Sequence, residues 1–124
     1  MNIEEEIVEK GLTAPRITMA DIEAKIADEF YFTAANGVDG TGYPRNVYID
    51  TTPTPLEMLT FCVLVLRNGF TVTGESACVS PQNFDADIGK KIAHQNAVDK
   101  IWLLEGYLLK ERVHECINIA LNKV

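Results

Sequence analysis

The sequence has 124 residues, of which 47% are hydrophobic and 23% are charged, and this composition is that of one globular domain with its own core. The formal net charge is −7, and residues 1–60 carry eleven acids against four bases, whereas residues 61–124 carry seven of each. The acidic balance excludes a binder of the double-stranded DNA backbone, and the lack of a long apolar run excludes a membrane-spanning protein.

The cysteine pattern and the first ten residues indicate the cellular compartment of the protein. Cys62, Cys78 and Cys116 include no C-x-x-C pair, and the opening MNIEEEIVEK is too acidic for an export signal. We expect a cytoplasmic protein with three free thiols. The polar residues 1–17 are expected to form an acidic, solvated extension in front of a single α+β domain, residues 18–124.

A helix is predicted directly after this extension. Thr18 precedes Asp21 by three residues, which is typical of a helix N-cap. Apolar residues then recur at spacings of three and four: Met19, Ile22, Ile26 and Phe30. The pattern predicts an amphipathic helix over about residues 19–30.

The next segment is rich in glycine and in turn formers. Residues 33–46, TAANGVDGTGYPRN, lose the apolar period, so they are predicted to form a loop. The segment lacks the lysine and the following helix of a phosphate-binding P-loop. A short edge strand is predicted at residues 47–49, and residues 52–55 are expected to lead extended into the next element.

The centre of the chain, Leu59 to Val79, reads as a β-hairpin. Asn68-Gly69 lies between two apolar runs, and this pair favours a two-residue turn with positive φ at both positions. Pairing Arg67 with Phe70 would place Cys62 and Cys78 on opposite faces. One face is expected to be core and the other only partly solvated.

Two helices are predicted after the hairpin. Asn83 or Asp85 can cap a helix that begins near Ala86, and a last helix is predicted over about residues 104–122, with Gly106 as the weak point between them. The last helix has a broad apolar stripe. Together with the two partly apolar faces of the hairpin, this stripe predicts a homo-oligomer.

No pattern indicates catalysis, a metal or a cofactor. His94 and His114 are twenty positions apart and lack the clustered ligands of a zinc site. The carboxylate pairs Asp85/Asp87 and Glu111/Glu115 are explained by a helix N-terminus and by a solvated helix face. We therefore expect a non-catalytic protein.

One cluster of cationic and polar residues is a candidate ligand site. Cations beside an aromatic ring suit a small anionic ligand that carries a base, although a solvated helix face explains the same residues. The candidate ligand-binding residues are Phe84, Lys90, Lys91, His94, Asn96 and Arg112.

The span from Asn68 to Leu109 resembles a family of small tailed-phage proteins named from gene numbers, the phage gene-product forty-nine or gene sixty-six family. The matching residues are Asn68-Gly69-Phe70, Val72, Gly74-Glu75-Ser76-Ala77-Cys78-Val79, Asn83-Phe84-Asp85, Ile88-Gly89, Lys91-Ile92-Ala93, Asn96-Ala97, Ile101-Trp102 and Leu104-Glu105-Gly106-Tyr107-Leu108-Leu109. The resemblance implies a phage protein in an infected or lysogenic bacterial host. Relatives commonly have a proline after the tryptophan, where this chain has Leu103, so the two C-terminal helices are either separate or continuous.

More distantly, the architecture is similar to that of the Thoeris anti-defence proteins. These are oligomeric phage sponges that sequester cyclic ADP-ribose-type immune signals, and some also hold cyclic oligonucleotides. The resemblance implies an aromatic ring stacked on adenine and arginines on the C-terminal helix, for which Phe84 and Arg112 are the nearest equivalents.

The expected fold is α+β, with a small antiparallel sheet around the central hairpin, one N-terminal helix and two C-terminal helices. The expected function is that of a phage accessory protein that sequesters a cyclic nucleotide. The alternative is a phage protein without a small-molecule ligand, whose acidic front half contacts a host protein.

Overall fold

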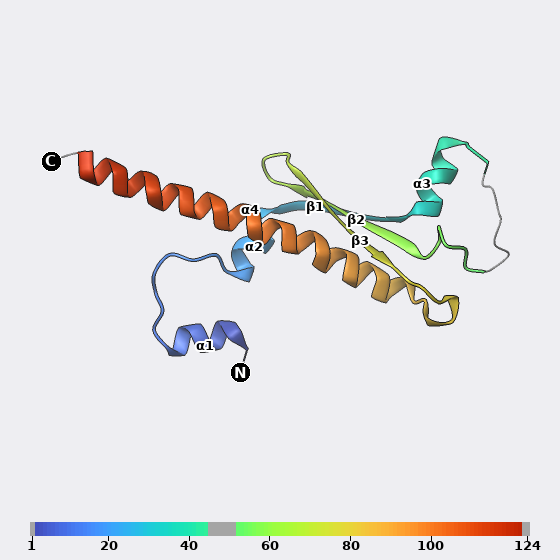
Figure 1. Ribbon diagram of the computed structural model, residues 1–124, viewed down its shortest axis with the longest axis horizontal. Coiled ribbons are helices and arrows are strands. Elements are labelled where there is room, and N and C mark those ends of the chain that lie inside the picture. The colour runs from blue at the N-terminus through green and yellow to red at the C-terminus, as the bar shows by residue number, and fades with distance from the viewer. Residues whose placement is uncertain (1, 45–51, 123–124) are drawn as a thin grey trace. The chain divides into compact units, whose positions relative to one another are not determined.

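A computed structural model describes residues 2–44 and 52–122 of the chain, which divides into two units (Figure 1). One unit is residues 25–100 and holds the sheet, and the other is residues 1–24 with residues 101–124. The elements are, in order, α1 (Ile3–Glu9), α2 (Met19–Lys25), β1 (Ile26–Thr33), α3 (Ala34–Thr41), β2 (Leu59–Leu66), β3 (Thr71–Ala77), the 3-10 turn η1 (Pro81–Asn83) and α4 (Ala86–Asn122).

The predicted α+β class is confirmed. The three strands form one antiparallel sheet in the order β1-β2-β3, and the first part of α4 lies along one side of it (Figure 1). The α4-facing side of the sheet is the core side, because its residues on β2 and β3 are buried. Those residues are Thr60, Cys62, Leu64, Leu66, Val72 and Gly74. Among the described residues, every helix is too short or too polar to span a lipid bilayer.

The central hairpin is confirmed, but its predicted register is wrong by one residue. Leu66 donates its N–H to the carbonyl of Phe70 at 2.8 Å, so the connection has three residues instead of two. Gly69 has φ +88°, whereas Asn68 does not have positive φ. Instead, Asn68 Oδ1 accepts the N–H of Phe70 at 2.9 Å, and this hydrogen bond stabilises the turn. The turn therefore needs only one residue with positive φ, which is Gly69.

The predicted helix over residues 19–30 ends early, because residues 26–33 form strand β1. α2 stops at Lys25, whose carbonyl accepts the N–H of Arg67 at 2.9 Å. From there β1 pairs with β2, with Phe30 opposite Val63 and Phe32 opposite Phe61. The aromatic run Phe30-Tyr31-Phe32 favours a strand, and pairing with β2 decides the conformation over the helical spacing of the apolar residues.

The predicted loop over residues 33–46 is wrong for most of its described part, because residues 34–41 form α3. Thr33 caps this helix through a reciprocal pair of bonds with Asn36, and Gly42, with φ +78°, ends it. Capping at both ends outweighs two internal glycines, each of which costs about 1 kcal/mol in a helix. The strand predicted at residues 47–49 lies outside the described residues.

The two predicted C-terminal helices are one helix, α4. Asp85 is its cap, since Asp85 Oδ1 accepts the N–H of Ile88 at 3.0 Å. Within the sheet unit, α4 approaches β3 so closely that a Cβ at Gly74 would overlap backbone atoms of Ala93 and Ala97. Gly106 lies inside the helix and does not break it, because a single glycine removes no backbone hydrogen bond.

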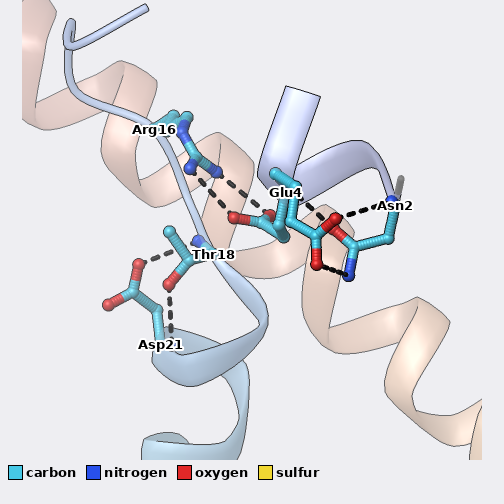
Figure 2. Close-up of polar contacts among 6 residues, drawn as sticks. Asn2, Glu4, Arg16, Thr18 and Asp21 are labelled. Carbon is cyan, nitrogen blue, oxygen red and sulfur yellow. Dashed lines mark hydrogen bonds and ion pairs between the residues drawn. The ribbon is translucent and has the colours of Figure 1, made fainter. Parts of the chain in front are cut away.

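The other unit contains a short helix within the predicted extension. α1 is capped by Asn2 and Glu5, and its Glu4 forms a two-pronged ion pair with Arg16, at 3.1 and 2.9 Å (Figure 2). The N-cap predicted for α2 is present: Thr18 Oγ1 accepts the N–H of Asp21 at 3.2 Å, and Asp21 Oδ2 accepts the N–H of Thr18 at 2.9 Å (Figure 2). The boundary between an extension 1–17 and a domain 18–124 stays a prediction.

Candidate functional site

A hollow in the sheet unit lies between β1 and α4, and we call it the β1–α4 groove. Its volume is about 690 Å³, which is within the range of small-molecule sites. It is lined by Glu29 and Tyr31 from β1 and by Asp87, Lys90, Lys91, His94 and Gln95 from α4.

The local structure explains why these side chains meet. Glu29 and Tyr31 are two residues apart on β1, so they share a side of the strand, and their partners on β2 are the buried Leu64 and Cys62. The α4 residues are spaced by three and four positions along the helix, which places them on one helical face.

A hydrogen bond joins the two walls of the groove. The Tyr31 hydroxyl lies 3.1 Å from His94 Nδ1, and Glu29 Oε2 lies 3.7 Å from the same nitrogen. Both contacts are made on one side of the imidazole ring, and its Nε2 is the other ring nitrogen. His94 is part-buried, with 35% of its side chain exposed, so the ring is held and still reachable by solvent.

Tyr31 is paired across the sheet with Cys62, which is buried. Burial first, and then the neighbouring Cys62 and Glu29 side chains, raise the pKa of Tyr31 from 10.0 to about 12. Burial also raises the pKa of the Cys62 thiol, with a smaller rise from Glu29, whereas its hydrogen bond to Tyr31 lowers it. Both groups are therefore protonated at neutral pH, and Tyr31 remains a hydrogen-bond donor.

The groove combines both charge signs. Lys90 and Lys91 bring positive charge, and Glu29 and Asp87 bring negative charge. Gln95 donates to Asp99 at 2.9 Å, one turn along α4. Such a site suits a ligand that carries both an anionic group and hydrogen-bond donors.

The structure brings three of the six sequence-predicted residues together. Lys90, Lys91 and His94 line the groove. Phe84 follows η1, where its N–H is donated to the carbonyl of Pro81, and it does not line the groove. Asn96 Nδ2 donates to the main-chain carbonyl of Glu75 at 2.8 Å, so this residue ties α4 to β3.

Arg112 belongs to the other unit. There it lines a separate, apolar hollow of about 430 Å³ with Pro15, Leu109, Val113, Cys116, Ile117 and Ala120. The lining of this hollow makes it a surface for apolar contact rather than for an anion. Cys116 is exposed, Cys78 is part-buried and Cys62 is buried, and all three are free thiols.

Sequence reasoning missed the β1 wall of the groove, namely Glu29 and Tyr31. The helical spacing assigned these residues to the face of a helix, whereas the alternation of Glu29, Tyr31 and Thr33 along a strand would have indicated a shared side. Within the described residues, no three histidine, cysteine, aspartate or glutamate side chains gather as a metal-binding group.

Comparison with curated proteins and with solved structures gave no match. The likeness to the Thoeris anti-defence proteins therefore stays a prediction. A family model does match residues 17–113, which is most of the chain and includes both walls of the β1–α4 groove. The chain belongs to the Phage protein (N4 Gp49/phage Sf6 gene 66) family.

Proposed function

We propose that this protein is a non-catalytic phage accessory protein that sequesters a small nucleotide-derived anion in the β1–α4 groove. The ligand would be an immune signal of the cyclic ADP-ribose type or a cyclic oligonucleotide, and binding would serve anti-defence. The observation that carries the proposal is the presence of Lys90, Lys91 and His94 on one wall of a hollow of about 690 Å³.

The chemistry of the groove supports a nucleotide over a simple anion. Two lysines offer point charges to phosphate groups. Glu29 and Asp87 would repel a bare phosphate, but their carboxylates accept hydrogen bonds from ribose hydroxyls or from an exocyclic amine. Tyr31 adds an aromatic ring beside these polar groups.

Tyr31 serves binding in this proposal, because its pKa of about 12 keeps the hydroxyl protonated at neutral pH, where it can donate a hydrogen bond. The other lining groups would bind the phosphate, base and sugar of the ligand.

The test is calorimetry with a panel of cyclic ADP-ribose isomers and cyclic di- and trinucleotides. We expect the double variant Lys90→Glu/Lys91→Glu to weaken binding of the active compound at least tenfold, because two attractive charges become repulsive. Lys110→Glu is the control, since it reverses the charge of a single lysine on exposed α4 surface that does not line the groove. No heat with any compound would overturn the proposal.

Two further variants locate the site. Phe84→Ala and Arg112→Glu alter residues that were predicted from sequence but do not line the groove, and we expect both to bind the active compound with unchanged affinity. If these variants lose binding while Lys90→Glu/Lys91→Glu keeps it, the ligand lies elsewhere on the chain.

We also propose contact with protein, first of all self-association, as a second function. The observation that favours it is the exposed apolar surface of α4 in the unit with the N-terminus, where Ile117, Ile119 and Leu121 are 53%, 57% and 68% exposed. The apolar hollow beside Pro15 continues this surface. Sedimentation at micromolar concentration should give a mass above that of the 13.8 kDa monomer.

A further inference from the structure

We propose that Asp87 determines the specificity of the β1–α4 groove by selecting a ribonucleotide whose two ring hydroxyls are both free. Its carboxylate accepts hydrogen bonds from the two hydroxyls, while Lys90 and Lys91 hold the phosphate. This inference rests on the function proposed above and narrows the chemical class of the ligand.

The three charged residues of α4 are arranged along one wall of the groove. Asp87 lies in the first turn of the helix, and Lys90 and Lys91 follow it by three and four positions. Residues at these spacings share one helical face and are separated by about 5 Å along the axis. The wall therefore changes from negative to positive within one turn. A ribose 5′-phosphate has the complementary polarity, because its phosphate and its two ring hydroxyls lie at opposite ends of the sugar.

Asp87 is not needed to cap the helix. Asp85 supplies the cap, since its Oδ1 accepts the N–H of Ile88 at 3.0 Å. Within residues 2–44 and 52–122, no hydrogen bond or ion pair engages the side chain of Asp87, Lys90 or Lys91. Both carboxylate oxygens and both ammonium groups are therefore open to a ligand.

The second carboxylate of the groove already has protein partners. Glu29 lies beside Tyr31 on β1, and its Oε2 is 3.7 Å from His94 Nδ1. Asp87 is thus the carboxylate with unused acceptor capacity. An ionised carboxylate only accepts hydrogen bonds, and its two oxygens can accept from two adjacent hydroxyls at once.

The charge of Asp87 also sets the orientation of the ligand. A helix N-terminus attracts phosphate, but a carboxylate in the first turn repels it, so the phosphate is directed to the lysines one turn further along. A 2′-deoxy ligand offers the carboxylate one donor instead of two. A ligand without hydroxyls offers none and meets only repulsion at this end of the groove.

Titrations of the full-length protein with ADP, 2′-deoxy-ADP and pyrophosphate test this selection, with affinities measured by amide NMR. We expect wild type to bind ADP about tenfold more tightly than 2′-deoxy-ADP, the lower end of what a hydrogen bond to a charged group contributes, because Asp87 is exposed. In Asp87→Asn the preference should fall below about twofold, since the amide has one acceptor oxygen and no charge. The affinity for pyrophosphate should instead rise about two- to threefold, because a repulsive charge is removed.

Asp85→Asn is the matched control. It removes the same charge two positions away, outside the groove lining, and asparagine caps a helix as well as aspartate does. We expect this variant to prefer ADP as strongly as the wild type does.

Three results would overturn the inference and leave the proposed function standing. These are equal binding of ADP and 2′-deoxy-ADP by the wild type, an unchanged preference in Asp87→Asn, and an equal loss of affinity for all three probes in Asp87→Asn, which would indicate a structural role. If none of the probes shifts the amide signals of Lys90, Lys91 and His94 at millimolar concentration, the inference is also overturned. The panel of cyclic compounds then decides the proposed function by itself.

Discussion

Gly74 is the position at which the sheet and α4 come closest. Because a Cβ there would overlap the carbonyl oxygen of Ala93 and the amide nitrogen of Ala97, Gly74→Ala must push backbone apart. We expect a loss of about 1–3 kcal/mol in the free energy of unfolding. The control is Gly37→Ala in α3, where nothing lies within 4 Å of the new Cβ and where alanine should stabilise by about 0.5–1 kcal/mol. Urea unfolding measures both, and equal stabilities would contradict the close approach.

Tyr31 should make stability depend on alkaline pH. A group whose pKa is raised on folding holds its proton more tightly in the folded state, so its contribution is complete below pH 10 and is lost as the pH rises toward 12. Between pH 9 and pH 11 we expect the wild type to lose up to about 1 kcal/mol more than Tyr31→Phe, because pH 11 is still below the folded pKa and because solvent reaches the ring. Urea unfolding at both pH values gives the difference. Parallel losses in the two proteins would contradict it.

The three thiols should differ in reactivity according to their burial. Cys116 is exposed on α4, whereas Cys62 is buried and its thiol has a raised pKa. A bulky thiol reagent at pH 7.5 should therefore label Cys116 at once and Cys62 only when the protein unfolds. Mass spectrometry of labelled peptides locates each modification. Labelling of Cys62 as fast as Cys116 in the folded protein would show that the core side of the sheet is open.

Among the elements, α1 is held to the rest of its unit by the Glu4–Arg16 ion pair. The hydrogen bond from Arg16 lowers the pKa of Glu4 below its ordinary value of 4.5, so the stabilisation is present at neutral pH and is lost as the pH falls through this lowered pKa. We expect α1 to become mobile as the pH falls below the lowered pKa of Glu4, and already at pH 7 in Arg16→Ala. ¹⁵N relaxation of α1 measures this mobility.

The control for this element is Lys10→Ala. This variant removes the exposed i,i+4 pair of Lys10 with Glu6, at 3.1 Å, which lies within α1 and its cap. Such a pair contributes only a few tenths of a kcal/mol to a helix, so α1 should stay as ordered as in the wild type at pH 7. Loss of order in Lys10→Ala equal to that in Arg16→Ala would show that the Glu4 contact does not hold the helix.

The elements that local sequence determines were predictable, and those that distant partners determine were not. The cap at Thr18 was predicted, and Asp85 was one of the two caps proposed for α4, because a cap depends on residues three positions away. β1 was missed because its helical spacing is overridden by pairing with β2, a strand some thirty residues further along the chain. The hairpin register was missed because Asn68-Gly69 predicts a turn in which both residues have positive φ. In the structure only Gly69 has positive φ.

Dependence on partners far apart in the chain also explains why only part of the candidate site was predicted from the sequence. Lys90, Lys91 and His94 share a helical face that spacing alone reveals. Glu29 and Tyr31 join them only once β1 is a strand, and the hydrogen bond between Tyr31 and His94 spans 63 positions of the chain. Asn96 was predicted to bind a ligand because it is polar and near the cations, but its amide instead contacts β3.

The exposed part of α4 gives a prediction for the assembled protein. No side chain described between Trp102 and Asn122 is fully buried, and a helix of this length with so little packing is only marginally stable in water. If copies associate through this surface, amide exchange in residues 108–120 should slow as protein concentration rises. Hydrogen exchange mass spectrometry measures this, with Val113→Asp/Ile117→Asp as the variant expected to exchange fast at every concentration. Protection that is independent of both concentration and variant would exclude self-association through α4.

The contact of Asn96 with Glu75 affects whether a strand of another chain can add to this sheet. β3 is an outer strand, and outer strands expose main-chain groups on which a foreign strand can assemble. The side chain of Asn96 occupies the carbonyl of Glu75, and Lys100 Nζ lies 3.5 Å from Thr73 Oγ1 on the same strand. A strand that added at β3 would first have to displace these two side chains of α4. The helix thus protects this edge of the sheet from the addition of a foreign strand.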